Sequence, residues 1–329
     1  MTIFHLIYLY QLVRSVYDSE TNVKAVYPKH FDSKAFHHYL SLARVSSAKD
    51  DSLLLQNLNA AAVDSKKTLG LTNSGVLLFT KCPRDFIAES SLTAVRYRGV
   101  DKFSVLDRKD FVGNIIEQID SGIEFALKHI EVEYEITGEG ARIEHHRFPL
   151  VAVREALINA LVHRDYTYQN SCVYLNIFSD RIEFENPGGI PGGKSANEIE
   201  GKSYRRNPLL ADLLFRAGYG EKLGSGLSRM KQALFENGNP RYQIAASNFF
   251  SLRFLPRVSK VKNININFTE RQVEILSLLN SSPRPLTSSE LANHFRISTA
   301  TITRNLKELL KMKLIEAIGV GKSIRYKAV

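Results

Sequence analysis

The spacing of apolar residues along the chain predicts interspersed helices and strands. Between Asp107 and His129 apolar residues recur every four positions, which indicates one long amphipathic helix. From Leu92 to Tyr97 the alternation is typical of a strand. The same reasoning predicts helices over about 32–43, 52–62, 150–164 and 208–217 and from about 227, and strands over 132–136, 141–146, 172–178, 181–185 and 249–255. Together these elements predict an α+β fold.

The C-terminal segment contains three capped helices followed by two short strands. Thr269 caps the first helix, and Thr287 with Glu290 forms a capping box at the start of the second. Ser298 caps the third helix after a tight turn at 296–297. The helices reach about residues 279, 295 and 312, and the strands cover 314–316 and 323–328. This order predicts a winged helix-turn-helix over residues 268–329, after a polar linker at 258–267.

The third of these helices separates an apolar face from a polar one. Ile302, Leu306, Leu309 and Leu310 share the face that packs inward. The opposite face carries short hydroxyls and two cations, which suit the major groove of DNA, while cations of the wing suit phosphates. The predicted DNA-binding residues are Ser298, Thr299, Thr301, Thr303, Arg304 and Lys307 on the helix and Lys322 and Arg325 on the wing. The alternative is a winged helix used only for protein contacts.

The positive charge of the chain is concentrated at its C-terminal end. Residues 257–329 contain 13 Lys and Arg against 5 Asp and Glu, which is most of the net charge of +10. A basic end on a nearly neutral body favours a nucleic acid partner. A solvated basic face without any partner is the alternative on charge alone.

Cysteine usage and hydropathy favour a cytoplasmic protein. The two cysteines, Cys82 and Cys172, lie far apart without metal-ligand or disulfide spacing, as expected in a reducing compartment. The apolar start, residues 1–17, is interrupted by polar residues and is too short to span a bilayer. We therefore expect no membrane association.

A polar stripe follows one side of the helix predicted at 150–164. Glu155, Asn159 and His163 are four residues apart and therefore lie on the same side of a helix. An amide oxygen is a ligand for Mg²⁺, and a carboxylate can orient or deprotonate a water molecule. The stripe thus suits metal–phosphate chemistry, although taken alone such a stripe is more often a solvated face.

The sequence around this stripe resembles a motif of a known superfamily. Residues 154–166, Arg-Glu-Ala-Leu-Ile-Asn-Ala-Leu-Val-His-Arg-Asp-Tyr, resemble the N-box of the GHKL superfamily, which includes gyrase, histidine kinases and mismatch-repair ATPases. Three later stretches match in the same order: 186–193, 206–208 and 221–227. The chain most resembles bacterial transcriptional regulators in which a Schlafen-type AlbA-like domain precedes a divergent ATP-binding domain and a winged helix. Of the AlbA-like domain only about 71–99 is recognisable.

The resemblance implies a site for ATP or ADP with Mg²⁺. It implies that Asn159 holds the Mg²⁺ ion and that Glu155 is the candidate general base. Glycines would let the backbone approach the nucleotide. The nucleotide-binding residues implied are Asn159, His163, Asn186, Gly188, Gly189, Gly224, Ser225 and Gly226. The sequence departs from the superfamily in one respect, because Asn186 stands near the position of the aspartate that reads adenine.

These observations together predict three domains and a regulatory function. We expect a partial AlbA-like region at 1–100, a GHKL-like α/β sandwich at 101–257 and the winged helix. The expected function is a DNA-binding transcriptional regulator that senses nucleotide. The alternatives are a slow DNA-associated ATPase or kinase, and a non-catalytic DNA scaffold with a degenerate pocket. A homodimer is expected because winged helices often read paired half-sites. The P-loop match at 188–195 is disfavoured, because Pro187 and Pro191 interrupt the loop and Gly201 follows soon after it.

Overall fold

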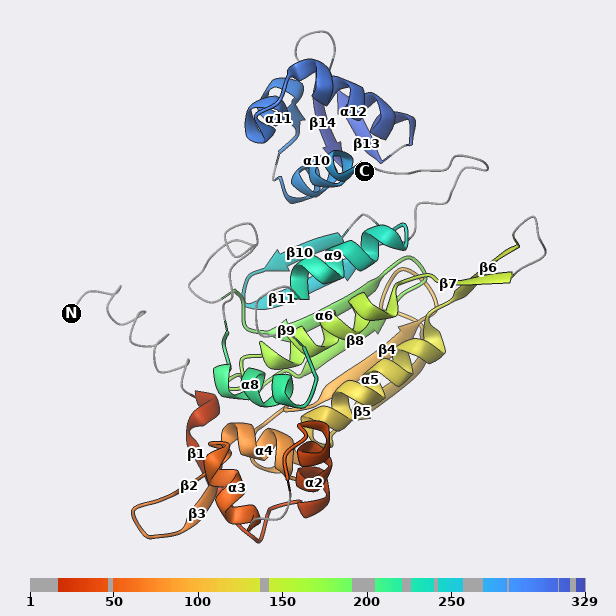
Figure 1. Cartoon of the computed structure of the whole chain (residues 1–329). Helices are drawn as coiled ribbons and strands as arrows, with labels where there is room; N and C mark the ends of the chain where they lie inside the picture. Colours follow the sequence, from red (N-terminus) through yellow and green to blue (C-terminus); the bar gives the residue numbers. More distant parts are fainter. Residues whose placement is uncertain are drawn as a thin grey trace. The chain divides into compact units, whose positions relative to one another are not determined.

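The structure is a computed structural model of the whole chain (Figure 1). It describes residues 17–46, 50–136, 142–190, 205–220, 226–239, 242–256, 269–282, 284–312, 314–319 and 324–328. The predicted linker at 258–267 lies outside these residues. None of the helices in these ranges is long and apolar enough to cross a membrane.

The chain divides into two compact units. The first comprises Met1–Glu131, Leu150–Met230 and Ile244–Arg253, and the second comprises Val132–Pro149, Lys231–Gln243 and Phe254–Val329. The architecture is mixed α+β, with an extended mixed sheet, covering helices and a C-terminal helix-turn-helix segment.

The first unit begins with a small three-stranded sheet and short helices. The elements are η1 (Tyr17–Ser19), β1 (Thr21–Val26), α2 (Ser33–Leu42), α3 (Asp51–Asn57), β2 (Ala61–Val63), β3 (Leu69–Thr72), α4 (Asn73–Phe79) and η2 (Pro83–Asp85). The strand order is β1-β3-β2, with antiparallel pairing throughout. Helix α2 begins where Asp32 accepts hydrogen bonds from the Lys34 and Ala35 amides, as a helix N-cap does.

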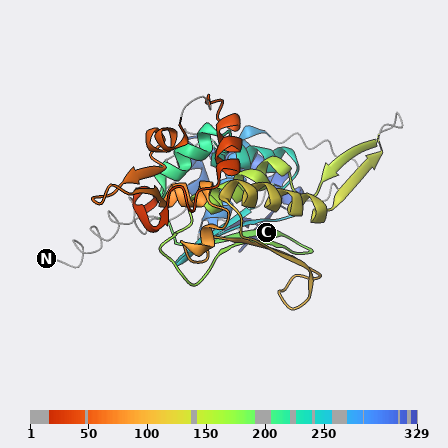
Figure 2. The ribbon, with the colours of Figure 1, turned by 90° about the horizontal axis from the view of Figure 1, so that it is seen from below.

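A six-stranded mixed sheet follows, with the order β10-β11-β9-β8-β4-β5. The elements of this part are β4 (Leu92–Tyr97), β5 (Val105–Phe111), α5 (Ile115–His129), α6 (Leu150–Val162), β8 (Val173–Ile177), β9 (Ile182–Pro187), α8 (Pro208–Arg216), α9 (Gly226–Glu236), β10 (Tyr242–Ala246) and β11 (Phe249–Phe254). Strands β4 and β8 are parallel, whereas β4–β5 and β8–β9 are antiparallel. Helices α5 and α6 pack against each other on the same face of the sheet (Figure 2).

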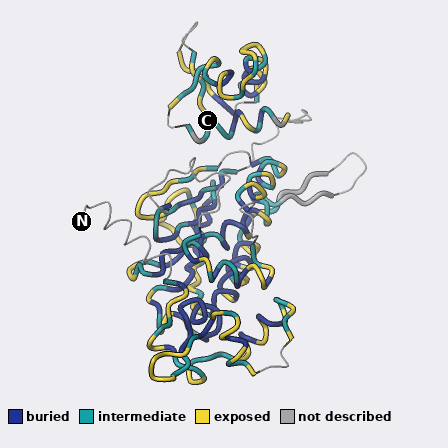
Figure 3. Tube along the Cα trace, turned by 60° about the vertical axis from the view of Figure 1, so that its left-hand side comes forward, coloured by how far each residue is buried: buried dark blue, intermediate teal, exposed yellow. Residues whose placement is uncertain are grey.

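The second unit contains the hairpin β6 (Val132–Ile136) and β7 (Arg142–His146) and the winged-helix elements. These are α10 (Glu270–Ser281), β12 (Leu286–Thr287), α11 (Ser288–Phe295), α12 (Thr299–Lys311), β13 (Ile315–Ile318) and β14 (Arg325–Ala328). The three helices enclose a buried core of their own, which includes Ile275, Leu291, Ile302 and Leu306 (Figure 3). Leu310, predicted to face inward, packs against this core.

Two helices predicted from the periodicity are shorter in the structure. The helix predicted over 107–129 is the strand β5 followed by α5, because Asn114 caps a helix that begins only at Ile115. The Asn114 side chain accepts hydrogen bonds from the Ile116 and Glu117 amides. The helix predicted over 52–62 ends at Asn57, and its last residues belong to β2. In both cases apolar residues of a strand continue the helical spacing by chance. Six strands were not predicted: β1, β2, β3, β5, β10 and β12.

Candidate functional site

Helix α6 brings the polar stripe into the interior of the protein. Asn159 Nδ2 donates a hydrogen bond of 3.1 Å to Glu155 Oε1, and Glu155 is only 7% exposed. His163 follows the end of the helix and is half-buried. Most residues of α6 belong to the core, so the helix has no broad solvated face. The alternative of a solvated stripe is therefore wrong for Glu155.

Gly226, the first residue of α9, lies directly against Glu155. A Cβ atom on Gly226 would be 1.9 Å from Glu155 Oε1, so a side chain here would displace the carboxylate. The structure thus brings Gly226, predicted from one motif, against Glu155, which was predicted together with Asn159 from another. Gly224 and Ser225, predicted with Gly226, lie outside the described residues.

The donor set around Asn159 fits a magnesium ion that a nucleotide helps to bind. Asn159 uses its amide N–H group on Glu155, which leaves the amide oxygen as its acceptor. Within the described residues no group of three His, Cys, Asp or Glu could hold a metal. Mg²⁺ usually takes one or two protein oxygens together with phosphates and water. Asn159 could supply the protein oxygen, with the nucleotide and water supplying the remainder and Glu155 placed to orient a water molecule.

Packing within the protein explains why glycines occupy the turn after β9. Gly188 has φ +95°, a conformation that favours glycine, and its amide donates to the Asn248 carbonyl at 2.9 Å. A Cβ on Gly189 would be 1.9 Å from the Ser247 carbonyl oxygen. Asn186 is buried and donates to the neighbouring Pro187 carbonyl at 3.3 Å. Gly189 is thus required by the approach of the Ser247 backbone, and Gly188 by its positive φ and by Asp165, whose Cβ would lie 2.7 Å from a Cβ on Gly188, whether or not a ligand also binds here.

Asp165 and Arg206 lock this turn, and neither was predicted as a site residue. Arg206 Nη1 is 3.2 Å from Asp165 Oδ2, and Nη2 donates to the Gly189 carbonyl. The Asp165 amide donates to the Pro187 carbonyl at 2.9 Å. The pair therefore ties the loop after α6 to the glycine turn. The signal in the sequence was that Asp165 and Arg206 each lie in a stretch, 154–166 and 206–208, that matches the resembled family.

His163 is held in its neutral form. Burial, together with the positive charges of Arg206 and Arg205, lowers the pKa of His163 to about 4. At neutral pH the imidazole is therefore uncharged and can act as a hydrogen-bond donor or acceptor. It does not supply a positive charge to a phosphate group.

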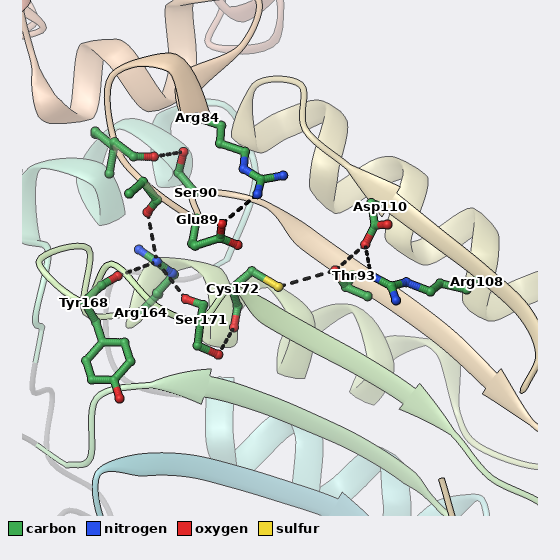
Figure 4. Close-up of polar contacts among 12 residues, drawn as sticks. Arg84, Glu89, Ser90, Thr93, Arg108, Asp110, Arg164, Tyr168, Ser171 and Cys172 are labelled. Atoms are coloured by element: carbon green, nitrogen blue, oxygen red, sulfur yellow. Dashed lines mark hydrogen bonds and ion pairs between the residues drawn. The ribbon is translucent and has the colours of Figure 1, made fainter. Parts of the chain in front are cut away.

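Arg164 anchors the loop between α6 and β8 from inside the protein (Figure 4). Its side chain is fully buried, and Nη2 donates to the carbonyls of Ala88, Tyr168 and Ser171 at 3.3, 2.9 and 3.0 Å. The guanidinium also lies over the Tyr166 ring, 4.7 Å from its centroid. Arg164 therefore has a structural role, although it lies within the motif that carries the resemblance.

In the second unit, α12 presents an exposed polar face. Ser298, Thr299, Arg304 and Lys307 are exposed, whereas Thr301 and Thr303 are half-buried. Ser298 caps the helix through the Thr301 amide, and the Thr303 hydroxyl donates to the Thr299 carbonyl. Thr299, Arg304 and Lys307 are thus the residues of the predicted set best placed for an outside partner.

The wing residue Arg325 is tied to the helix-turn-helix by a small ionic cluster. Its Nη1 is 3.7 Å from Glu290 Oε2 and donates to the Pro285 carbonyl at 3.2 Å. Arg284 contacts the same carboxylate group at 2.7 Å. Hydrogen bonds from Thr287 and Arg284 lower the pKa of Glu290 to about 2, so the cluster stays ionised. Lys322, the other predicted wing residue, lies outside the described residues.

Two family models match successive parts of the chain. Residues 170–254 match the family described as "Putative ATP-dependent DNA helicase recG C-terminal", and residues 269–317 match "Bacterial regulatory protein, arsR family". The chain therefore carries an ATPase-like domain followed by an ArsR-type helix-turn-helix, the combination predicted from the sequence. The first match begins after α6, so the roles of Glu155 and Asn159 stay predictions.

One solved structure extends the likeness to almost the whole chain. It is the crystal structure of the DIP2311 protein from Corynebacterium diphtheriae, with a TM-score of 0.60 and 21% sequence identity. The alignment covers 98% of this chain, which spans 66% of the length of that one. At this identity the likeness shows the fold alone. None of the curated proteins matches the chain. The AlbA-like, Schlafen-type and GHKL features stay predictions.

Proposed function

We propose that the protein is a DNA-binding transcriptional regulator whose central domain binds ATP or ADP with Mg²⁺ as a signal. The proposal rests on the occurrence of an ATPase-like domain and an ArsR-type helix-turn-helix in one chain. A nucleotide that binds one arrangement of the domains more tightly would shift the population toward it. The affinity for DNA would then depend on the nucleotide.

The nucleotide part of the proposal is supported by the contact of Gly226 with Glu155 and the bond from Asn159. Asn159 would hold Mg²⁺ against the phosphates, and Glu155 would orient water. Gly188 and Gly189 would let the backbone approach the base or ribose. Asn186 would offer adenine both a donor and an acceptor, where an aspartate offers only acceptors.

Calorimetric titration of the full chain with Mg-ATP and with Mg-ADP tests nucleotide binding. We expect Asn159→Ala to weaken binding by at least about tenfold, the usual loss when a metal site is perturbed. Asn170→Ala, at an exposed position outside the stripe, is the matched control and should bind as the wild type does. Absence of heat with both nucleotides at millimolar concentration would remove the sensing role.

The DNA part of the proposal is supported by the exposed cations of α12 and by the C-terminal excess of positive charge. Cations that neutralise phosphates release counterions, so affinity should fall steeply with salt. The double substitution Arg304→Ala/Lys307→Ala should weaken binding to duplex DNA and lower the salt slope by about two units. Its thermal stability should equal that of the wild type, since both side chains are exposed.

Fluorescence anisotropy with a labelled random-sequence duplex at several salt concentrations measures this effect. Lys66→Ala removes a positive charge from an exposed turn of the first unit and serves as the control. If the control weakens binding as much as the α12 variant does, the contact would be general electrostatic attraction and not insertion of this helix.

The proposal also includes a homodimeric state and a location in the cytoplasm. Paired winged helices would match paired half-sites on DNA.

The second candidate is a slow DNA-associated ATPase, which the position of the buried Glu155 beside Asn159 favours. Turnover stimulated by DNA that disappears in Glu155→Gln, with nucleotide binding retained, would establish it. If nucleotide binds without turnover, the sensor is favoured. If neither occurs while DNA still binds, the protein is a scaffold with a degenerate pocket.

A further inference from the structure

Helix α9 belongs to both compact units of the chain. The boundary between the units falls within it, after Met230, so residues 226–230 lie in the first unit and the remaining residues in the second. Met230 and Leu234 are four residues apart on the same side of the helix, and each is 1% exposed. A helix is stabilised by hydrogen bonds between its own residues and moves as a rigid element, so a displacement at one end also displaces the other.

The first end of α9 lies at the candidate nucleotide site. Gly226 packs so closely against Glu155 that a Cβ atom on this glycine would lie 1.9 Å from Glu155 Oε1. Asn159 donates its hydrogen bond to the same oxygen atom. A nucleotide that draws Asn159 toward Mg²⁺ and Glu155 toward water therefore changes the surface against which the first turn of α9 packs.

The residues that follow α9 bond to the backbone at the end of β11. Asn239 is fully buried, and its Nδ2 donates to the carbonyls of Arg147 and Leu255 at 2.9 and 3.0 Å. Asn237 Nδ2 donates to Asn239 Oδ1 at 2.7 Å. All four residues belong to the second unit. Leu255 directly follows β11, so a movement of this end of α9 reaches the backbone that continues toward the linker predicted at 258–267.

A side-chain contact connects the same end of α9 with α10, the first helix of the winged helix. Lys231 of α9 lies over the ring of Tyr242 on β10, with Nζ 5.4 Å from the ring centroid. The Tyr242 hydroxyl is 3.5 Å from Ser277 Oγ on α10, and all three residues belong to the second unit. Hydrogen bonds between hydroxyls usually measure about 2.5–3.0 Å, so this bond is weak and a small displacement breaks it. Such a contact suits an element that must form in one state and open in another.

We propose that α9 couples the nucleotide site to the winged helix. Nucleotide bound at Glu155 and Asn159 displaces α9, and the contact between Tyr242 and Ser277 transmits the displacement to α10. This coupling rests on the proposed function, since it requires that both nucleotide and DNA bind. A coupling free energy is reciprocal, so DNA changes the affinity for nucleotide by the same factor as nucleotide changes the affinity for DNA.

The coupling factor of the full chain tests this route. It is the ratio of the dissociation constants for a labelled random-sequence duplex without nucleotide and with saturating Mg-ATP or Mg-ADP, measured by fluorescence anisotropy. Allosteric factors are typically about 5–150-fold, and we expect the wild type to lie in this range. Tyr242→Phe removes only the hydroxyl and should bring the factor at least about threefold closer to one. Its separate affinities for nucleotide and for duplex should equal those of the wild type, because Tyr242 lies in neither predicted site.

Ser277→Ala removes the other hydroxyl of the contact. The double variant Tyr242→Phe/Ser277→Ala should lose no more coupling than either single variant, because each substitution alone abolishes the same bond. Both positions are half-buried, so we expect all three variants to fold. Ser282→Ala is the matched control at the end of α10. Its hydroxyl donates to the Arg284 carbonyl at 2.6 Å, away from Tyr242, and its loss should leave the coupling factor unchanged.

The outcomes separate this route from the regulatory function itself. A wild type that binds nucleotide without any change in DNA affinity would remove the proposed function and the route together. A wild type that responds to nucleotide, with Tyr242→Phe and Ser277→Ala responding equally, would overturn the route alone. The same conclusion would follow if Ser282→Ala reduced the coupling as much as Ser277→Ala does, or if the losses of the two single variants added in the double variant.

Discussion

Helices α6 and α12 both carry the residues on which the function was predicted, yet they hold them in opposite ways. On α6 Glu155 is buried, and the half-buried Asn159 donates a hydrogen bond to it. On α12 the core residues Ile302, Leu306 and Leu309 are fully buried, and Arg304 and Lys307 on the other face are exposed.

The difference teaches what kind of partner each helix suits. Buried polar groups must be satisfied by the protein itself, so those of α6 are oriented before a small ligand arrives. Exposed groups are satisfied by water and can exchange it for a macromolecule. Substitutions around α6 should therefore change stability and function together, whereas substitutions on the polar face of α12 should change binding alone.

The largest effect is expected at Arg164, just beyond the end of α6. Arg164→Met fills a similar volume but leaves the carbonyls of Ala88, Tyr168 and Ser171 without their donor. Each buried group left unsatisfied costs about 1–3 kcal/mol, so we expect the free energy of unfolding to fall by about 4 kcal/mol. Urea unfolding measures the change.

Arg154→Met is the matched control, because Arg154 is exposed on α6 and its replacement should change stability by less than about 0.5 kcal/mol. If Arg164→Met were as stable as the wild type, the free-energy cost of burying the guanidinium would equal the stabilisation that its hydrogen bonds provide.

The next effect is a pH dependence that originates at His163. Its pKa is lowered to about 4 in the folded protein, so between about pH 6.5 and 4 the unfolded chain binds more protons. The contribution of His163 to the free energy of unfolding is fully present above pH 6.5 and is lost as the pH falls toward 4. The loss amounts to about 3 kcal/mol.

Thermal unfolding of the wild type and of His163→Gln across this pH range measures the effect. The variant cannot titrate, so its stability should fall less between pH 6.5 and 4. Parallel pH profiles would show that His163 is not the group responsible.

A smaller effect on stability, whose sign depends on the residue at position 155, is expected at Gly226. In the wild type, Gly226→Ala places a methyl group 1.9 Å from Glu155 Oε1 and should destabilise the fold by about 1 kcal/mol. In a Glu155→Ala background the methyl group has room, and alanine is the better helix former. The substitution should then be neutral or stabilising. Additive effects in this double-mutant cycle would contradict the contact.

The smallest effect is expected near α12 and acts through the backbone. Arg296 ends α11 with φ +52°, a left-handed conformation that glycine adopts without strain. Arg296→Gly should therefore raise the free energy of unfolding by about 0.5–1 kcal/mol. Differential scanning calorimetry measures the shift, and Arg304→Gly within α12 should instead lower stability by about 1 kcal/mol.

Local signals in the sequence determined much of the secondary structure and the composition of the candidate sites. Strand β4 was predicted with its observed bounds, and the helix caps Thr269, Thr287 and Ser298 form as predicted. The stripe of Glu155 and Asn159 followed from helical geometry alone. Capping and periodicity involve residues a few positions apart, so the sequence displays them directly.

The tertiary structure alone decided how those residues are used. It buried Arg164 and Glu155, placed the Ser247 carbonyl against Gly189, paired Arg206 with Asp165 and left β5 at the edge of its sheet. It also converted the start of a predicted helix into that strand. Each of these outcomes depends on contacts between residues distant in sequence, which the path of the chain determines and local pattern does not encode.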